Sequence, residues 1–139
     1  MTRLTRRYTF SASHRLHSAA MSEEENADLY GKCNNPYGHG HNYILAVTVE
    51  GEVDPESGRV VGPGALDRFV RETILEPLDH RDLNTDVPDF KLLVPTTENL
   101  AVVVGRRLHS AWPGYFHRAH LAGIHIEETK RNSFQLKIS

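Results

Sequence analysis

The chain of 139 residues has one cysteine, no long apolar run and no strong excess of either charge. Because Cys33 alone cannot form an internal disulfide, we expect a reducing compartment, the cytoplasm. No apolar stretch approaches the roughly 18 residues of a membrane-spanning helix, and the basic start lacks the apolar segment of a signal peptide. Sixteen Lys and Arg against 18 Asp and Glu give a formal charge of −2, so the net charge does not indicate a nucleic-acid-binding protein.

The composition is that of one folded domain with an excess of histidine. Hydrophobic residues make up 39% of the sequence and charged residues 24%, which is typical of a globular protein. The length predicts a single domain over residues 1–139, and no internal repeat is present. Nine histidines are many for a protein of this size. The histidines are therefore the feature that a functional hypothesis has to explain.

The periodicity of apolar residues predicts an α+β fold. Strict alternation indicates strands over about residues 7–16, 39–53, 120–128 and 133–138. Helical spacing over 65–76, ended by Pro77, and a second helix after Pro95 fall between the second and third strands. The order β-β-α-α-β-β is typical of a four-stranded antiparallel sheet with two helices on one face. Residues 17–38 are expected to form an excursion between the first two strands.

Three histidines have the spacing of a metal site. His39 and His41 are separated by Gly40 on a predicted strand, so both imidazoles project from one face. His14 lies near the end of the preceding strand, and pairing of the two strands would bring the three rings together. Three neutral imidazoles suit Zn²⁺, and an open fourth position is the catalytic arrangement. The alternative is that these are strand histidines satisfied by ordinary hydrogen bonds.

Four further residues are candidates for the chemistry. Cys33 is a fourth metal ligand, an activated thiol or an inert buried cysteine. Asp79 and His80 follow the first helix, where the carboxylate either orients the imidazole or belongs to a solvated loop. Glu128 ends a strand on the face of Ile124 and Ile126, so it needs a partner or ligand unless that end is exposed.

Five segments, taken in order, resemble one known family. They are Phe10–Leu16 (FSASHRL), Gly31–Tyr43 (GKCNNPYGHGHNY), Pro77–His80 (PLDH), Pro95–Leu100 (PTTENL) and Glu128–Thr129. Together they resemble the 6-pyruvoyltetrahydropterin synthase family, which includes the 6-carboxytetrahydropterin synthases of the queuosine pathway. The resemblance covers about residues 6–138. The spacing between Cys33 and His39 is more similar to the pyruvoyl-type enzymes.

The resemblance implies a fold, an assembly and a reaction. The fold is the tunnelling fold, in which trimers close a twelve-stranded barrel and two trimers stack as a homohexamer with active sites between subunits. The reaction is the zinc-dependent conversion of 7,8-dihydroneopterin triphosphate to 6-pyruvoyltetrahydropterin with release of triphosphate. The carboxy-type reaction on the same pterin is the enzymatic alternative. A pterin-binding protein with a structural zinc closed by Cys33 is the non-enzymatic one.

The resemblance also assigns residues. His14, His39 and His41 would bind Zn²⁺, and Cys33 would accept a proton as a thiolate. Asp79 and His80 would complete a relay, contributed by a neighbouring subunit. Glu128 would act on the substrate and anchor the pterin ring, and Thr96 and Thr97 would line the pocket.

One segment departs from the family pattern, and five histidines stay without a role. Gly62-Pro63-Gly64 stands where the family usually has Asp or Asn, so we expect the first helix to begin without a side-chain cap. The histidines without a converging pattern, expected on the surface, are His17, His109, His117, His120 and His125.

Overall fold

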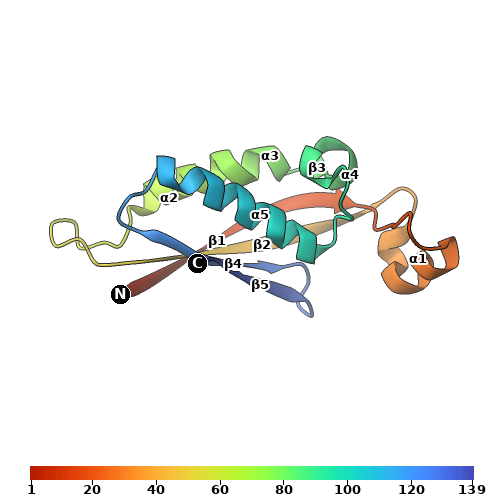
Figure 1. Cartoon of the computed structure of the whole chain (residues 1–139), viewed down its shortest axis with the longest axis horizontal. Helices are drawn as coiled ribbons and strands as arrows, with labels where there is room; N and C mark the ends of the chain where they lie inside the picture. Colours follow the sequence, from red (N-terminus) through yellow and green to blue (C-terminus); the bar gives the residue numbers. More distant parts are fainter.

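The computed structural model describes residues 1–139, in which one twisted sheet lies beneath a layer of helices (Figure 1). The strands are β1 (Thr2–His14), β2 (His39–Gly51), β3 (Arg81–Asp82), β4 (His120–Glu127) and β5 (Ser133–Lys137). Their order in the sheet is β3-β1-β2-β4-β5. The four long strands pair antiparallel, and β3 pairs parallel with β1 at Ala12 and Ser13.

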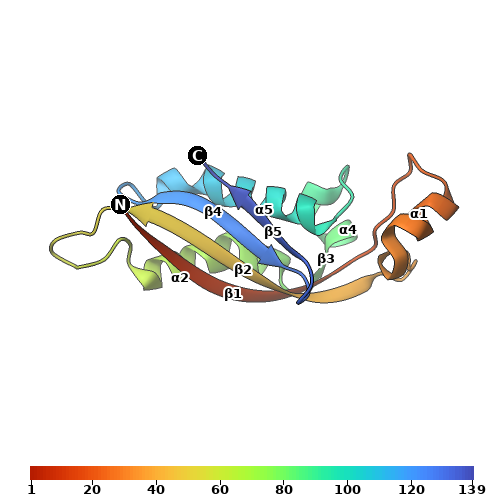
Figure 2. The same cartoon turned by 90° about the horizontal axis from the view of Figure 1, so that it is seen from below.

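The helices lie mainly on one face of the sheet, as Figures 1 and 2 show. They are α1 (Glu23–Tyr30), α2 (Pro63–Val70), α3 (Glu76–Leu78), α4 (Leu83–Asp86) and α5 (Thr97–Ala111). A core of 24 buried residues fills the space between the sheet and α2, α3 and α5. α1 projects beyond one end of the sheet (Figure 2). None of the helices has the length and hydrophobicity needed to cross a bilayer.

The α+β class and the order of long elements are confirmed, with one difference in the sheet. The sequence predicts four antiparallel strands, whereas β3 adds a fifth, parallel strand of two residues. Two residues are too few to show a period of two, so no pattern in the sequence could indicate this strand. Its pairing with β1 holds the segment after α3 against the edge of the sheet.

The first predicted helix begins earlier and ends later than its apolar spacing indicates. As expected, Gly62 makes no side-chain cap, and Pro63 occupies the first helical turn, where a missing amide is tolerated. Pro77 does not end the helix, and a π-helical turn over Arg71–Leu75 precedes it. Pro77 then falls in the first turn of α3, which ends at Leu78.

The excursion between β1 and β2 contains a helix, α1, that was not among the predicted elements. Ser22 caps α1, accepting a hydrogen bond from the Glu25 amide, while the Glu25 side chain accepts from the Ser22 amide. Asn26, the one fully buried residue of α1, donates to the carbonyls of Ser18, Met21 and Ser22. The side-chain oxygen of Asn26, Oδ1, accepts a hydrogen bond from the Ser18 backbone amide. This polar network fixes the loop that leads from β1 into α1.

Candidate active site

The register of β1 against β2 brings histidines of the two strands together. His14 lies opposite His39, and Ala12 lies opposite His41. The ring centroids of His14 and His41 are 4.8 Å apart, and those of His39 and His41 are 4.7 Å apart. His14 is fully buried, whereas His39 is exposed at the start of β2. The predicted pairing of the two strands therefore places the three rings side by side.

Four side chains could hold a metal ion between them. One ligand atom from each of His14, Cys33, His41 and Glu128 lies within 4.8 Å of the others. His39 is not among these four, although its ring contacts that of His41. The remaining histidines do not join this group. The structure thus combines two of the three predicted histidine ligands with the predicted thiol and carboxylate.

Backbone contacts between two loops hold Cys33 at the site. The Leu16 amide donates to the Cys33 carbonyl at 2.7 Å, and the Asn34 side-chain amide donates to the Leu16 carbonyl at 2.8 Å. The Cys33 Sγ then lies 3.8 Å from His41 Nε2. The thiol is half-buried. The segment just after His14 therefore positions the turn that carries Cys33.

Glu128 is fixed by contacts to both of its carboxylate oxygens. Its Oε1 lies 3.3 Å from His41 Nε2, and its Oε2 accepts a hydrogen bond from the Thr97 hydroxyl. Thr97 is buried at the start of α5, and Thr96 caps that helix by accepting from the Asn99 amide. The Glu128 carboxylate therefore has partners within the protein and is not an exposed strand end. The start of α5 meets the end of β4 at this point.

His14 supplies the strongest indication of a ligand. Its Nε2 is buried and has no hydrogen-bond partner. A buried polar atom without a partner is costly, and the neutral imidazole nitrogen is the commonest metal ligand in proteins. Imidazole, thiolate and carboxylate are the ligand types that Zn²⁺ takes. The residues present therefore fit a metal ion of this kind.

Burial controls the protonation of the cluster. Desolvation lowers the pKa of His14 to about 4, assisted by the nearby His41. Desolvation also lowers the pKa of His41, against the opposing effect of Glu128. The pKa of the Cys33 thiol is raised by burial and by the charge of Glu128. At neutral pH both imidazoles are neutral and able to bind a metal, whereas the thiol needs a nearby positive charge to ionise.

The lowered pKa of His14 predicts an acid-sensitive metal-free protein. Between pH 6.5 and about 4 the unfolded protein binds a proton at His14 that the folded protein does not. The free energy of unfolding should therefore fall by about 3 kcal/mol over this range, with no further loss from this group at lower pH. Denaturant titrations of chelator-treated protein at pH 7 and pH 4 measure the effect. A His14→Gln variant with an unchanged pH dependence would refute the assignment.

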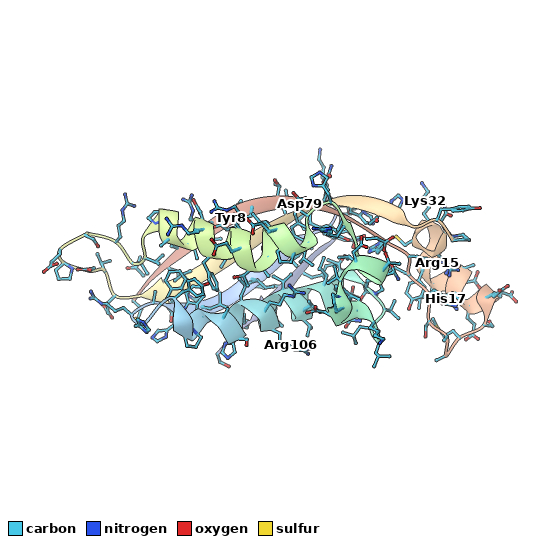
Figure 3. The ribbon with its side chains drawn as sticks, turned by 90° about the horizontal axis from the view of Figure 1, so that it is seen from above. Tyr8, Arg15, His17, Lys32, Asp79 and Arg106 are labelled. Carbon is cyan, nitrogen blue, oxygen red and sulfur yellow. The ribbon has the colours of Figure 1, made fainter.

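Asp79 and His80 form a pair away from this cluster. The Asp79 carboxylate accepts from the Ser11 amide at 2.8 Å and lies 3.1 Å from His80 Nδ1. His80 has a φ of 60°, and its amide donates to the Ser11 carbonyl. Its side chain is 81% exposed. Figure 3 shows Asp79 well separated from Arg15 and Lys32, which adjoin His14 and Cys33 in the sequence. The fold does not bring this pair to the Cys33 of the same subunit.

One buried residue at the site was absent from the sequence-based candidates. Tyr43 is fully buried, and its hydroxyl lies 3.4 Å from His14 Nδ1. Its ring contacts that of His41 at a centroid distance of 5.7 Å. The period of two already places Tyr43 on the face of His39 and His41. An aromatic residue on that face is typical of a core, and no pattern in the sequence indicates its hydroxyl contact.

Known proteins share both the sequence and the fold of this protein. Residues 3–138 match the family described as 6-pyruvoyl tetrahydropterin synthase. A protein of Poecilia reticulata named 6-pyruvoyl tetrahydrobiopterin synthase is 49% identical over 129 residues, covering 93% of this chain and 85% of the relative. The human protein of that name is 52% identical over 110 residues, covering 79% and 76%.

A solved structure agrees with these sequence relatives. The 6-pyruvoyl tetrahydropterin synthase of Caenorhabditis elegans superposes with a TM-score of 0.88 at 42% identity, covering 99% of this chain and 96% of the other. The matched residues include both strands that carry the histidines, the Cys33 turn and the end of β4. The chain therefore belongs to the 6-pyruvoyl tetrahydropterin synthase family.

Proposed function

We propose that this protein is a zinc-dependent lyase that converts 7,8-dihydroneopterin triphosphate to 6-pyruvoyltetrahydropterin and triphosphate. The observation that carries the proposal is the buried, unpartnered His14 Nε2 beside His41, Cys33 and Glu128. Relatives about half identical in sequence carry the name of the pyruvoyl-type enzyme, which favours this reaction over the carboxy-type one.

His14, His39 and His41 are the proposed zinc ligands. His39 lies opposite His14 in the register, with its ring beside that of His41, so a change of its side-chain rotamer would complete the set. Its exposure leaves room for that change. A zinc ion held there would act as a Lewis acid toward the hydroxyl oxygens of the pterin side chain and acidify the neighbouring C–H bonds. Cys33 and Glu128 would then remain free for proton transfer.

Cys33 is the proposed proton acceptor. Its sulfur lies 3.8 Å from His41 Nε2, so a thiolate there would share the space beside the proposed zinc ligands with the substrate side chain and could take a proton from it. Because burial and Glu128 raise the pKa of the thiol, it needs a positive charge beside it. The pair Asp79–His80 is the proposed source, with the imidazole held by the carboxylate. Since this pair is exposed on its own subunit, it would serve the site of a neighbouring one.

Glu128 is proposed to take part in proton transfer next to Cys33. The approach of its Oε1 to His41 Nε2 supports a role at the reacting side chain, and its anchoring of the pterin ring stays a prediction. Thr96 and Thr97 are proposed to line the pocket from the start of α5, where Thr97 already holds the carboxylate. The amide end of α5 then faces the bound substrate.

We further propose the homohexamer of two stacked trimers, with active sites shared between subunits in the cytoplasm. The outer edge of β5 has no partner within the subunit, and β3 covers only Ala12 and Ser13 of β1. Open edges of this length are normally paired or protected. Pairing between subunits would satisfy them and would bring an exposed His80 toward another subunit's site.

Product analysis tests the proposed reaction directly. The zinc-loaded protein is incubated with 7,8-dihydroneopterin triphosphate, and the products are identified by mass spectrometry. The expected products are 6-pyruvoyltetrahydropterin and triphosphate, formed without any added nicotinamide. Acetaldehyde together with 6-carboxytetrahydropterin would assign the carboxy-type reaction instead. A lack of triphosphate release at full zinc loading would overturn the enzymatic proposal and favour a pterin-binding protein with a structural zinc.

A further inference from the structure

The side chain of Asn84 binds the backbone of Arg15 on both sides, one residue beyond the end of β1. Its Oδ1 accepts a hydrogen bond from the Arg15 amide at 2.7 Å, and its Nδ2 donates to the Arg15 carbonyl at 2.9 Å. A carboxamide has an acceptor and a donor side by side, so it pairs with a peptide backbone as a neighbouring strand would. Because a peptide N–H only donates and a carbonyl only accepts, these two contacts also fix the orientation of the Asn84 amide.

The Asn84 contact continues the pairing of β3 with β1. β3 pairs with β1 in a register that puts residues 69 positions apart opposite one another, and Asn84 and Arg15 have the same separation. Between β3 and Asn84, the Leu83 side chain is fully buried. The Asp82 carboxylate accepts a hydrogen bond from the Asn84 backbone amide at 2.9 Å. The backbone of Asn84 is therefore held in place, and its side chain extends the edge of the sheet by one more pair.

The peptide group between Arg15 and Leu16 connects this contact to Cys33. Its carbonyl, on Arg15, accepts from Asn84. Its N–H, on Leu16, donates to the Cys33 carbonyl at 2.7 Å. Because a trans peptide group is planar, its C=O and N–H point in opposite directions and turn together. The orientation that Asn84 sets on one side of the group is therefore presented to the Cys33 turn on the other. Figure 3 shows Arg15 and Lys32, which precedes Cys33, at the same end of the molecule.

His14 lies on the other side of Arg15 and is held independently. It lies opposite His39 in the pairing of β1 with β2, and it is fully buried. β1 ends at His14, so this strand pairing fixes the proposed zinc ligand and stops before the next two residues. The place of the Cys33 thiol relative to the ligands therefore depends on how those two residues are held.

We propose that Asn84 is a positioning residue that sets the place of the Cys33 thiol relative to the proposed zinc ligands, acting through the peptide group between Arg15 and Leu16. The inference rests on the proposed function, in which Cys33 accepts a proton from the substrate. A displacement of about 1 Å at a reacting group can lower a rate by about 100-fold. Asn84 itself is exposed, so its replacement leaves no cavity in the core and removes only its two hydrogen bonds to Arg15.

Amide hydrogen exchange of the metal-free protein tests the contact without depending on zinc or turnover. In Asn84→Ala, the Leu16 amide should exchange about 10-fold faster than in the wild type, the size expected when two exposed hydrogen bonds are lost. The Leu16 amide is the informative one, because its acceptor is the Cys33 carbonyl itself. Nuclear magnetic resonance of the two proteins at one pH and temperature measures the rates.

Kinetics of the zinc-loaded protein separate positioning from a general effect on stability. Asn84→Ala should lower kcat for triphosphate release by about 10–100-fold, while KM stays within about threefold and the zinc content stays at the wild-type level. Asn84→Asp keeps the acceptor for the Arg15 amide and lacks the donor for the Arg15 carbonyl. Its loss of kcat should therefore be smaller than that of Asn84→Ala.

Thr85→Ala is the matched control, because Thr85 is the next residue of α4, is exposed, and has its hydroxyl hydrogen-bonded to Asp86 and not to Arg15. Its Leu16 exchange and its kcat should both equal those of the wild type. Unchanged Leu16 exchange in Asn84→Ala, unchanged kcat despite faster exchange, or equal effects in Thr85→Ala would each refute the proposal. A lack of triphosphate release by the wild type would overturn the proposed reaction, whereas the exchange rates would still decide whether Asn84 holds the Cys33 turn.

Discussion

Replacing Cys33 with alanine is expected to reduce triphosphate release by about 10²–10⁴-fold, the usual contribution of a general base. The zinc content should stay at the wild-type level, because the proposed ligands are the three histidines. The small change in volume at a half-buried position should leave the fold intact. Steady-state kinetics and metal analysis of the same preparation test both statements. Parallel loss of zinc and activity would instead identify Cys33 as a ligand that closes a structural site.

Mixing experiments sharpen this prediction, because the proposed relay is divided between subunits. His80→Ala should also be nearly inactive, since no positive charge would then lower the pKa of the thiol. Subunits with Cys33→Ala and subunits with His80→Ala, unfolded together and reassembled, should regain part of the activity in shared sites that combine an intact Cys33 and His80. Absence of recovery in a correctly assembled mixture would contradict a relay shared between subunits.

Substituting any of the three proposed ligands should weaken zinc binding by more than about 100-fold, since even the partners of metal ligands contribute 10–100-fold. His14→Gln, His39→Gln and His41→Gln retain side-chain bulk and a polar end. Each should lower activity in proportion to the zinc lost, and equilibrium dialysis against chelator-buffered zinc measures the affinity. The reason is that three neutral imidazoles supply most of the binding, and two cannot complete the shell.

The His39 variant distinguishes between two possible ligand sets. Its ligand atom is outside the group formed by His14, Cys33, His41 and Glu128. If His39→Gln binds zinc as tightly as the wild type, the four-residue group would be the actual ligand set. His125→Gln is the control, because His125 belongs to β4 but is not part of the cluster. It should bind zinc normally.

Much of the fold and half of the candidate site could be predicted because they depend on strand periodicity. Alternation placed His39 and His41 on one face of their strand and His14 on the apolar face of the preceding one, and pairing of consecutive strands brought the three rings together. The second predicted helix does begin just after Pro95, with Thr96 as its cap. These features are local, so one stretch of sequence contains the necessary information.

Features that depend on contacts between distant segments could not be predicted. The pairing of β3 with β1 joins residues about seventy positions apart, and so does the contact of Asp79 with the Ser11 amide. The hydrogen bond between Thr97 and Glu128 depends on how α5 lies over the end of β4. The α1 helix could have been predicted, because Ser22 and Glu25 have the spacing of a capping box. Glu25 was instead interpreted as part of an acidic loop.

In the proposed site, the three histidines bind a zinc ion that keeps an open position, while Cys33 stays free. X-ray absorption at the zinc edge of the fully loaded protein tests this most directly. Three nitrogen ligands at about 2.0–2.1 Å and one oxygen ligand are expected, with no sulfur. A sulfur ligand at about 2.3 Å would place Cys33 on the metal and contradict the catalytic assignment.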